Sequence, residues 1–496
     1  MESGVLLGID HGGSTTTALV LDPESGAMTS RSVAMPKSMP RDGWVEHDPE
    51  DFLRTSLAAA AAALEVAGLT WRDVRAVGFA NQGETSMAWE SGDGGAIGPA
   101  LSWEDRRTAA LCETLAASGV DALVRERTGV LLDPYFSASK FRWLLDNVPA
   151  ANALAGEGRL RVGGTDSFVI DRLTGGAVHA TDAATGSRTA LLNLRQGRWD
   201  PDLIAAFGLD PSVMPEIRPT AGDFGAIGSA FTGCGQVAIT ADAVDAHAAM
   251  FAQGCRHPGV VKATYGTGAF IEVNTGTEPA EPDGHLPVFI AWDVGNRVEY
   301  TLEGAVFAVG SAIDWMVGAG IFASAEATSD LAASVPDSGG VAMVPSFTGL
   351  SAPHWKPAAR AGILGMGLAT TPAHVARALL DGIAFQCAEI IAAIGERQHA
   401  ALQEVRADGG PTRNSYLMQR QADVMGLPVL VSQEADMTAM GAALLAGIGA
   451  QQLHEGDLER FAPRMHRFEP RMGEDERQAA WAFWQRTVET LGGWEA

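Results

Sequence analysis

The 496-residue chain is poor in cysteine and in positive charge, and each shortage excludes a class of protein. Its four cysteines are scattered and form no C-x-x-C pair, so neither a disulfide framework nor a zinc knuckle is expected. Only 35 basic residues oppose 60 acidic ones, and the resulting net charge of −25 repels nucleic acid and anionic lipid. We therefore expect no nucleic-acid partner and no membrane partner.

Long apolar runs and targeting segments are also missing from the sequence. The longest apolar stretch, residues 57–64, is mostly alanine and too short to cross a bilayer. No basic segment with an apolar core precedes the first strand-like run, so a secretory signal is not supported. A soluble, cytoplasmic protein is expected. The sequence leaves the oligomeric state open, a homo-oligomer included.

Strand-like and helix-like segments alternate along the chain, which predicts the α/β class. The length exceeds what one core holds, and 46% apolar residues supply two interiors. Residues 5–21 and 260–273 share one pattern, in which two apolar runs flank a tip rich in glycine and threonine. Such a repeat, half a chain apart, predicts two domains of common design. We place these domains at residues 1–250 and 251–496.

The two tips, residues 12–17 and 266–268, have the composition of phosphate-binding loops. Glycine lets a phosphate approach the backbone N–H groups, and serine or threonine adds a hydroxyl donor. An ordinary tight turn explains either tip as well when it is taken alone. No G-x-x-x-x-G-K-[ST] motif is present, so a P-loop is excluded. The residues expected to face a phosphate are Gly12, Ser14, Thr15 and Thr267.

Two aspartates stand where phosphoryl transfer needs a carboxylate. Asp10 follows the first apolar run, and one carboxylate with several waters is enough to hold Mg²⁺ on nucleotide phosphates. The alternative for Asp10 is an Asx residue that stabilises the turn. Asp245 could take the proton of an attacking hydroxyl if it faced a cleft. From the pattern alone, a helix N-cap is the better interpretation of Asp245, and His247 is expected to be a packing residue.

Eight segments in the expected order resemble the FGGY carbohydrate kinase family, most closely its glycerol kinase branch. They are residues 43–49 (GWVEHDP), 81–85 (NQGET), 133–140 (DPYFSASK), 265–268 (YGTG), 302–307 (LEGAVF), 347–353 (FTGLSAP), 408–410 (DGG) and 440–443 (MGAA). Two family signatures are present, at residues 135–144 and 361–381. The resemblance covers nearly the whole chain. It implies two actin-like (ribonuclease H-like) domains, each with a five-stranded sheet, that close over ATP and Mg²⁺ in a deep cleft.

The resemblance also assigns roles by matching position. It makes Asp10 the magnesium-side acid and Asp245 the base that activates the acceptor hydroxyl, which reverses the N-cap interpretation of Asp245. Ser14 and Thr267 would hold phosphates. The implied polyol pocket contains Glu84, Trp103, Tyr135, Asp245 and Phe270. The implied nucleotide site contains Gly310, Asp314, Gly410 and Asn414.

Two positions of the polyol pocket depart from the family pattern. Gly83 stands where glycerol kinases carry the arginine of Asn-Gln-Arg-Glu-Thr, and Ala246 stands where a glutamine follows the catalytic aspartate. The lost guanidinium removes charge-assisted hydrogen bonds worth about 1.5–3 kcal/mol. This loss would be serious for glycerol, so we predict that the released space admits a longer polyol or sugar, with water filling as the alternative. Gly83→Arg is then predicted to shift preference toward glycerol.

Three further departures lie elsewhere. His11 replaces a glutamine beside Asp10. Asp314 replaces a nucleotide-side glutamine, and we expect it to point toward the base or ribose because a carboxylate repels phosphate. The loop at residues 233–236 lacks the arginine that binds fructose 1,6-bisphosphate in regulated relatives, so inhibition by that sugar phosphate is doubtful.

The leading hypothesis is an ATP-dependent kinase that phosphorylates a hydroxyl of glycerol or of a longer polyol or sugar. A ketose kinase of the xylulokinase type is the rival enzyme, although such relatives carry Gln-Met-His-Gly where this chain has residues 82–85. An actin- or chaperone-like ATPase without a small-molecule acceptor is the rival of another class. The aromatic residues assigned beside Asp245 favour a small-molecule acceptor.

Overall fold

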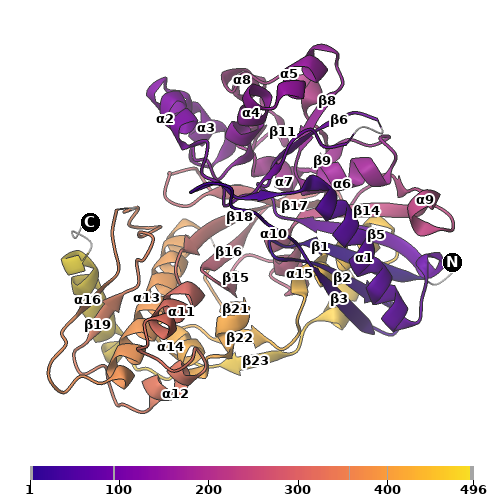
Figure 1. Ribbon diagram of the computed structural model, residues 1–496. Coiled ribbons are helices and arrows are strands. Elements are labelled where there is room, and N and C mark those ends of the chain that lie inside the picture. Colours follow the sequence, from indigo (N-terminus) through magenta and orange to yellow (C-terminus); the bar gives the residue numbers. More distant parts are fainter. Residues whose placement is uncertain (1–3, 93–94, 357, 399, 492–496) are drawn as a thin grey trace.

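Two large sheets organise the chain, one in each lobe of the computed structural model (Figure 1). The structure describes residues 4–92, 95–356, 358–398 and 400–491. The N-terminal sheet has the order β13-β14-β5-β1-β2-β3 and the C-terminal sheet the order β17-β18-β16-β15-β21-β22-β23. The N-terminal strands are β1 (Val5–His11), β2 (Thr15–Leu21), β3 (Met28–Ala34), β5 (Val74–Asn81), β13 (Ala226–Ile227) and β14 (Val237–Val244). The C-terminal strands are β15 (Val260–Tyr265), β16 (Ala269–Gly276), β17 (Val288–Val294), β18 (Arg297–Val306), β21 (Glu404–Asp408), β22 (Val429–Ser432) and β23 (Met465–Phe468).

The two sheets repeat one five-strand topology. Strands β1, β2 and β3 form an antiparallel meander. Strand β5 pairs with β1 in parallel, and β14 pairs with β5 in parallel. Strands β15, β16 and β18 form the matching meander. Strand β21 pairs with β15 in parallel, and β22 pairs with β21 in parallel. The predicted α/β class and the two domains of common design are confirmed. The sheets have six and seven strands rather than five because β13, β17 and β23 pair antiparallel with the edges.

Shorter strands form two-stranded sheets outside these layers. They are β4 (Glu46–His47), β6 (Met87–Glu90), β7 (Ala100–Leu101), β8 (Leu160–Gly163), β9 (Ala180–Asp182), β10 (Leu192–Asn193), β11 (Arg198–Trp199), β12 (Glu216–Arg218), β19 (Ala342–Val344) and β20 (Gly362–Leu364). The helices of the N-terminal lobe are α1 (Pro49–Ala67), α2 (Ala109–Ala117), α3 (Val120–Thr128), α4 (Ser137–Asn147), α5 (Pro149–Gly156), α6 (Thr165–Leu173), α7 (Ala183–Ser187), α8 (Pro201–Ala206), α9 (Ser229–Thr232) and α10 (Asp245–Ala252). The later helices are α11 (Gly310–Gly318), α12 (Ala327–Ala333), α13 (Pro372–Arg397), α14 (Ser415–Met425), α15 (Met437–Gly449) and α16 (Glu474–Leu491).

Helix α1 covers one face of the N-terminal sheet. Asp48 is its N-cap, and the side-chain oxygen accepts the N–H of Glu50 at 3.0 Å. Pro49 fits the first turn because its missing N–H would have no partner there. Gly68 ends the helix in the left-handed conformation at φ 71°. Local sequence therefore fixes both ends of this helix.

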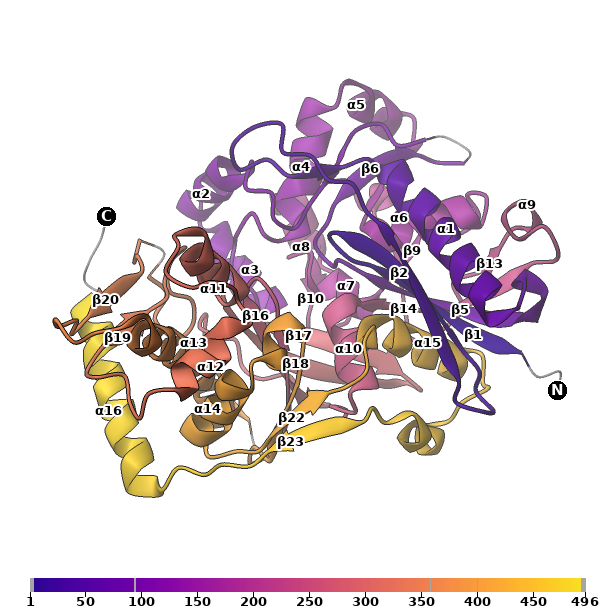
Figure 2. The ribbon, with the colours of Figure 1, turned by 60° about the horizontal axis from the view of Figure 1, so that its bottom comes forward.

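Helix α15 covers the opposite face of the sheet, and α10 packs against α15 (Figure 2). A Cβ atom at Gly8 of β1 would lie 1.9 Å from the carbonyl oxygen of Ala439 in α15. A Cβ atom at Gly441 of α15 would lie 1.9 Å from the carbonyl oxygen of Ala248 in α10. Backbone therefore packs directly on backbone. Although α15 comes late in the chain, it supports the N-terminal sheet, and the division at residue 250 stays a prediction.

Helix α13 runs through the C-terminal core. Within the described ranges it is the one helix that is long and apolar enough, by length and composition, to cross a membrane. The most apolar part of the helix is 72% buried inside the protein, against α12, α14 and strands of the C-terminal lobe. Its apolar surface is therefore accounted for by packing within the domain.

Candidate active site between the two domains

Asp10 and Asp245 lie near the same edge of the N-terminal sheet, at the ends of β1 and β14, with β5 between these two strands. Asp10 pairs with Ala80 across β1 and β5, and Asp245 directly follows β14, which is parallel to β5. Burial, and then the charges of Asp245 and Asp436, raise the pKa of Asp10 well above its usual value. The buried Oδ1 atom of Asp10 has no hydrogen-bond partner among the residues that the structure describes. An unpaired, buried carboxylate next to a second acid fits a site for a hard cation such as Mg²⁺.

Asp245 is the first residue of α10, and Val244 occupies the N-cap position. The Oδ1 atom of Asp245 accepts the N–H of Ala246 at 2.6 Å. Burial raises the pKa of Asp245, while this hydrogen bond and the charges of Arg188 and Lys262 lower it. A carboxylate whose proton affinity is raised above that of free aspartate is better suited to act as a base.

The three aromatic residues predicted for the polyol pocket come together. The ring of Trp103 lies edge-on to those of Tyr135 and Phe270, with centroids 6.0 and 6.4 Å away. The N–H of Trp103 donates to Thr85 Oγ1 at 3.2 Å, which attaches the aromatic wall to the 81–85 loop. Burial and the charge of Glu84 raise the pKa of Tyr135 well above its usual value, so its hydroxyl stays neutral. These contacts place the wall beside Glu84.

The 81–85 loop is held in place by buried hydrogen bonds. Asn81 Oδ1 accepts the N–H of Gly83 at 2.7 Å, and its Nδ2 donates to the carbonyl of Ala243 at 2.9 Å. Gly83 adopts φ 65°, a conformation that favours glycine. The fully buried Lys140 donates to the carbonyl of Glu84 at 3.3 Å and to the carbonyl of Tyr135. The loop is therefore tied both to the strand end that carries Asp245 and to the aromatic wall.

Arg188, which the sequence analysis missed, fills the space beside Gly83. A Cβ atom at position 83 would lie only 2.8 Å from Arg188 Cδ. Arg188 Nη1 donates to Glu84 Oε1 at 2.8 Å, and the guanidinium lies over the ring of Phe289 at 4.2 Å. The space that Gly83 was expected to release therefore already holds a guanidinium. One signal was available, because Arg188 is the only charged residue within positions 183–194.

Behind Arg188, a buried ionic network crosses to the C-terminal sheet. Arg188 Nη2 donates to Glu303 Oε2 and lies 3.3 Å from His247 Nε2. Lys262 Nζ donates to Glu272 Oε2 at 2.8 Å. Ligand atoms of His247, Glu272 and Glu303 lie within 4.8 Å of one another, an arrangement that could hold a metal ion. Arg188 and Lys262 already neutralise these carboxylates, so we interpret the cluster as an ionic network, and His247 belongs to it rather than to an apolar core.

The two glycine-rich tips both expose their hydroxyl side chains. Ser14 and Thr15 are exposed at the turn between β1 and β2, and Gly12 accepts from Gln82 Nε2 at 3.0 Å. At the second tip, Thr267 is exposed, and Gly310 donates its N–H to Gly266 at 3.0 Å.

Close backbone approaches bring three loops together around the second tip. A Cβ atom at Gly310 would lie 2.6 Å from Gly266 O, and one at Gly409 would lie 1.9 Å from Tyr265 O. The 266–268, 310 and 409–410 loops thus meet without intervening side chains, as a phosphate cradle requires. Gly410 lies next to this junction.

Asp314 and Asn414 were predicted for the nucleotide site, and His11 is the departure from the family pattern beside Asp10. Asp314 is exposed on α11, four residues after Gly310. Asn414 caps α14 by accepting the N–H of Leu417 at 3.0 Å, and its amide donates to Thr328 Oγ1 at 3.0 Å. Contact of either residue with a nucleotide stays a prediction. His11 points into the core, where its Nε2 bonds to Ser56 Oγ at 2.8 Å and burial lowers its pKa to about 3.

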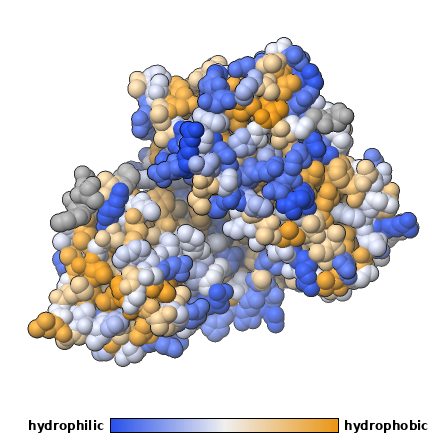
Figure 3. All heavy atoms as spheres, viewed as in Figure 1, coloured by the Kyte–Doolittle hydropathy of each residue, from blue (hydrophilic) through white to orange (hydrophobic). Residues whose placement is uncertain are grey.

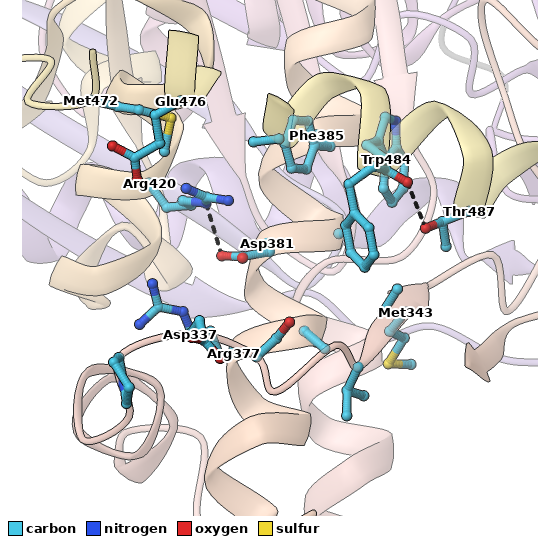
Figure 4. Close-up of a pocket in the computed structure, with 18 residues that line it drawn as sticks. Asp337, Met343, Arg377, Asp381, Phe385, Arg420, Met472, Glu476, Trp484 and Thr487 are labelled. Atoms are coloured by element: carbon cyan, nitrogen blue, oxygen red, sulfur yellow. Dashed lines mark hydrogen bonds and ion pairs between the residues drawn. The ribbon is translucent and has the colours of Figure 1, made fainter. Parts of the chain in front are cut away.

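The surface is hollowed between the two lobes (Figure 3). A separate cavity of about 200 Å³ lies in the C-terminal lobe, between α13, α14 and α16 (Figure 4). None of the predicted site residues lines this cavity. Two of its charged groups, Arg420 and Asp381, pair with each other at 3.0 Å. This cavity is therefore not part of the candidate site.

Known proteins resemble the chain over nearly its whole length. The models of the N-terminal and C-terminal domains of the FGGY family of carbohydrate kinases match residues 5–252 and 261–450. Glycerol kinases of Alkalilimnicola ehrlichii and Thermus brockianus are each 42% identical over 99% of this chain, covering 98% and 99% of their own lengths. The crystal structure of Plasmodium falciparum glycerol kinase with ADP matches with a TM-score of 0.93 at 29% identity, over 99% of this chain and 98% of that one. Xylulose kinase from Rhodospirillum rubrum matches with a TM-score of 0.86 at 25% identity, over 98% and 99%.

Proposed function

Because the chain belongs to the FGGY family of carbohydrate kinases, we propose that it transfers the γ-phosphoryl group of ATP to a hydroxyl of glycerol or of a closely related small polyol. One observation carries the choice of acceptor. The buried Glu84–Arg188 pair lies close to Asp245 and to the partly buried, edge-on rings of Trp103, Tyr135 and Phe270. Carboxylates accept hydrogen bonds from hydroxyls, a guanidinium donates to them, and aromatic faces pack on C–H groups. This combination suits a short, uncharged polyol.

Each part of the site has a task in phosphoryl transfer. Asp245 takes the proton of the attacking hydroxyl at its carboxylate. Asp10 holds Mg²⁺, which when bound neutralises charge on the transferring phosphates. The backbone N–H groups of the 12–17 and 266–268 tips bind and orient those phosphates. Closure of the two domains excludes water that would otherwise compete with the polyol.

Both rival functions have weaker support. The xylulokinase type is favoured only by structural likeness at 25% identity or less, whereas glycerol kinases match at 42% identity. An ATPase without a small-molecule acceptor leaves the buried Glu84–Arg188 pair and the aromatic wall without a use. A cytoplasmic location fits an enzyme that consumes ATP.

A screen of acceptors tests the proposed function directly. ADP release is measured with a coupled assay in the presence of glycerol, C4 to C6 polyols and ketoses, and without acceptor. We expect glycerol or another short polyol to raise ADP release well above the rate without acceptor, and ketoses to do so least. Hydrolysis that no polyol or sugar alters would contradict a kinase with a small-molecule acceptor.

The affinity for the polyol is expected to weaken as the pH falls through about 7. Burial raises the pKa of Glu84 to about 7, although Arg188 opposes this rise. Below that pH Glu84 gains a proton and loses an acceptor for polyol hydroxyls, so KM for the polyol should rise. The measurement is KM against pH from 6 to 9, with Glu84→Gln as the contrast. In that variant the overall KM should be higher, and this inflection should be absent.

A further inference from the structure

We propose that Arg188 is the positioning residue that sets polyol recognition, because it brings to the pocket, from the end of α7, the guanidinium that position 83 lacks. This inference rests on the proposed kinase function. In this arrangement Gly83 and Arg188 form a matched pair: the glycine leaves the space, and the arginine fills it and orients the Glu84 carboxylate. Both ends of the Arg188 guanidinium are bonded to Glu84 and Glu303, so the arginine acts on the polyol through Glu84.

The geometry around Gly83 makes the two positions interdependent. A Cβ atom at position 83 would come within 2.8 Å of Arg188 Cδ and 3.7 Å of Arg188 Nε. The backbone at Gly83, with φ 65°, would strain any other residue. No side chain can therefore be added at position 83 while Arg188 keeps its present place.

Arg188 itself is fixed on several sides. Its side chain is only 3% exposed and rests on Phe289, while Nη1 and Nη2 bond to Glu84 and Glu303. A guanidinium with both ends bonded has little rotational freedom, so the Glu84 oxygen that it contacts is also held in one place. Positional control of Glu84 is thus built into the unliganded pocket.

The pairing of strands explains why Arg188 is required. Glu272 lies directly opposite Lys262 on one side and Glu303 on the other, in the β15-β16-β18 register. Two carboxylates facing each other in a buried sheet repel, and only one of them has Lys262 as a partner. Arg188 supplies the second cation to Glu303. The charges of Lys262 and Arg188 thus balance those of Glu272 and Glu303, and Glu84 is one acid more than this balance.

This charge balance predicts how Glu84 responds to the loss of Arg188. The charged groups that act on Glu84 are Arg188 at the end of α7, Glu303 on β18 and Lys140 on α4, and the Tyr135 hydroxyl lies close to it. Arg188 is the largest influence that favours the ionised form of Glu84. Without it, Glu84 binds a proton more tightly, and a higher pH is needed before it can accept hydrogen bonds from the polyol.

The first test replaces Arg188 by glutamine and by lysine. Arg188→Gln is expected to raise KM for the polyol by about 10-fold to 100-fold, the loss of one charge-assisted contact, while KM for ATP changes little. The rise of KM at low pH should also begin at a higher pH than in the wild type. Arg188→Lys keeps a charge but not the two-ended contact, so it should recover part of both properties. If Arg188→Gln does not fold, the lysine variant alone carries the same two readouts.

The second test exploits the matched pair. Gly83→Arg alone is expected to be poorly folded or inactive, which revises the preference for glycerol predicted from sequence. Combining Gly83→Arg with Arg188→Ala should restore more polyol affinity than either change leaves alone. Arg161→Gln, which breaks an ion pair with Asp171 away from the pocket, is the matched control for losing an arginine. It should lower stability without changing KM or its pH profile.

The outcomes separate this inference from the proposed function. If the wild type phosphorylates a polyol but Arg188→Gln keeps both KM and the pH profile, the role of Arg188 is overturned and the kinase function stands. Equal losses for ATP and polyol, matching those in Arg161→Gln, would also overturn it by showing a purely structural role. If no polyol is phosphorylated and none raises the Tm of the wild type, both proposals fail.

Discussion

Replacing Asp245 by asparagine is expected to lower kcat by about a hundredfold to ten-thousandfold, the range over which a general base contributes. Asparagine keeps the shape of the side chain and can still accept the N–H of Ala246, so α10 should begin as before. It cannot take the proton of the attacking hydroxyl. The loss should therefore appear in kcat and not in the affinity for the nucleotide.

The pKa of Asp10 adds a second expected result for this variant. The charge of Asp245 is one of the causes that raise the pKa of Asp10. Neutralising Asp245 should make Asp10 easier to ionise, so the binding of Mg²⁺ and ATP should be retained or improved. Nucleotide binding is measured by the rise in Tm with ATP and Mg²⁺, and turnover by ADP release with the polyol.

Two further variants serve as controls for Asp245→Asn. Asp121→Asn removes an exposed carboxylate on α3 and should change neither measurement. Asp10→Asn should lose the Mg²⁺-dependent part of the rise in Tm, which separates the metal side from the base. Turnover retained in Asp245→Asn would remove Asp245 as the base.

The fold could be predicted where its signals are local in the sequence. The hairpins β1–β2 and β15–β16 each lie within about twenty residues, so their apolar runs and glycine-rich tips were readable, and their repetition indicated the two domains. The added edge strands β13, β17 and β23 were not predicted. Strand β13 has two residues and β23 is largely exposed, whereas β17 is buried; the place of each depends on which sheet edge the folded chain leaves open.

The candidate site likewise contains residues that short motifs indicate and contacts that only the fold brings together. Asp10, Glu84 and Tyr135 stand in short motifs that carry their own signal. The contact of Arg188 with Glu84 spans 104 residues and that with Glu303 spans 115. These contacts exist only because the end of α7 meets β18 across the domain boundary. The opposition of Glu272 and Glu303 depends on strand register, which composition does not determine.

His11 shows the limit of position matching. It follows Asp10 directly and replaces a glutamine of the family pattern, but the two neighbours do not share a face of the sheet. Successive side chains of a strand point to opposite faces, and His11 accordingly lies against Phe52 and Phe79 on the α1 side. Departures from a family pattern therefore have to be placed on a face before they are given a meaning.

Gly441→Ala is expected to cause a large loss of stability, about 1–3 kcal/mol in the free energy of unfolding or more. The added Cβ atom would lie 1.9 Å from the carbonyl oxygen of Ala248, which is backbone and cannot rotate away. Helices α10 and α15 would have to separate, although alanine is intrinsically the better helix former. The effect is measured as the shift in the midpoint of denaturant unfolding, with the slope of the free energy against denaturant concentration unchanged.

The same change should reach the chemistry, because α10 begins at Asp245. A shift of α10 moves the carboxylate relative to Asp10 and the 81–85 loop, so kcat should fall in the fraction that remains folded. Gly156→Ala is the matched control, since a Cβ atom there would meet nothing within 4 Å in the described parts of the chain beyond its own helix and chain neighbours. If Gly441→Ala unfolds at the same denaturant concentration as Gly156→Ala, the close contact of the two helices does not support the base. If it is destabilised but keeps full kcat, the position of Asp245 is fixed by β14 and not by α15.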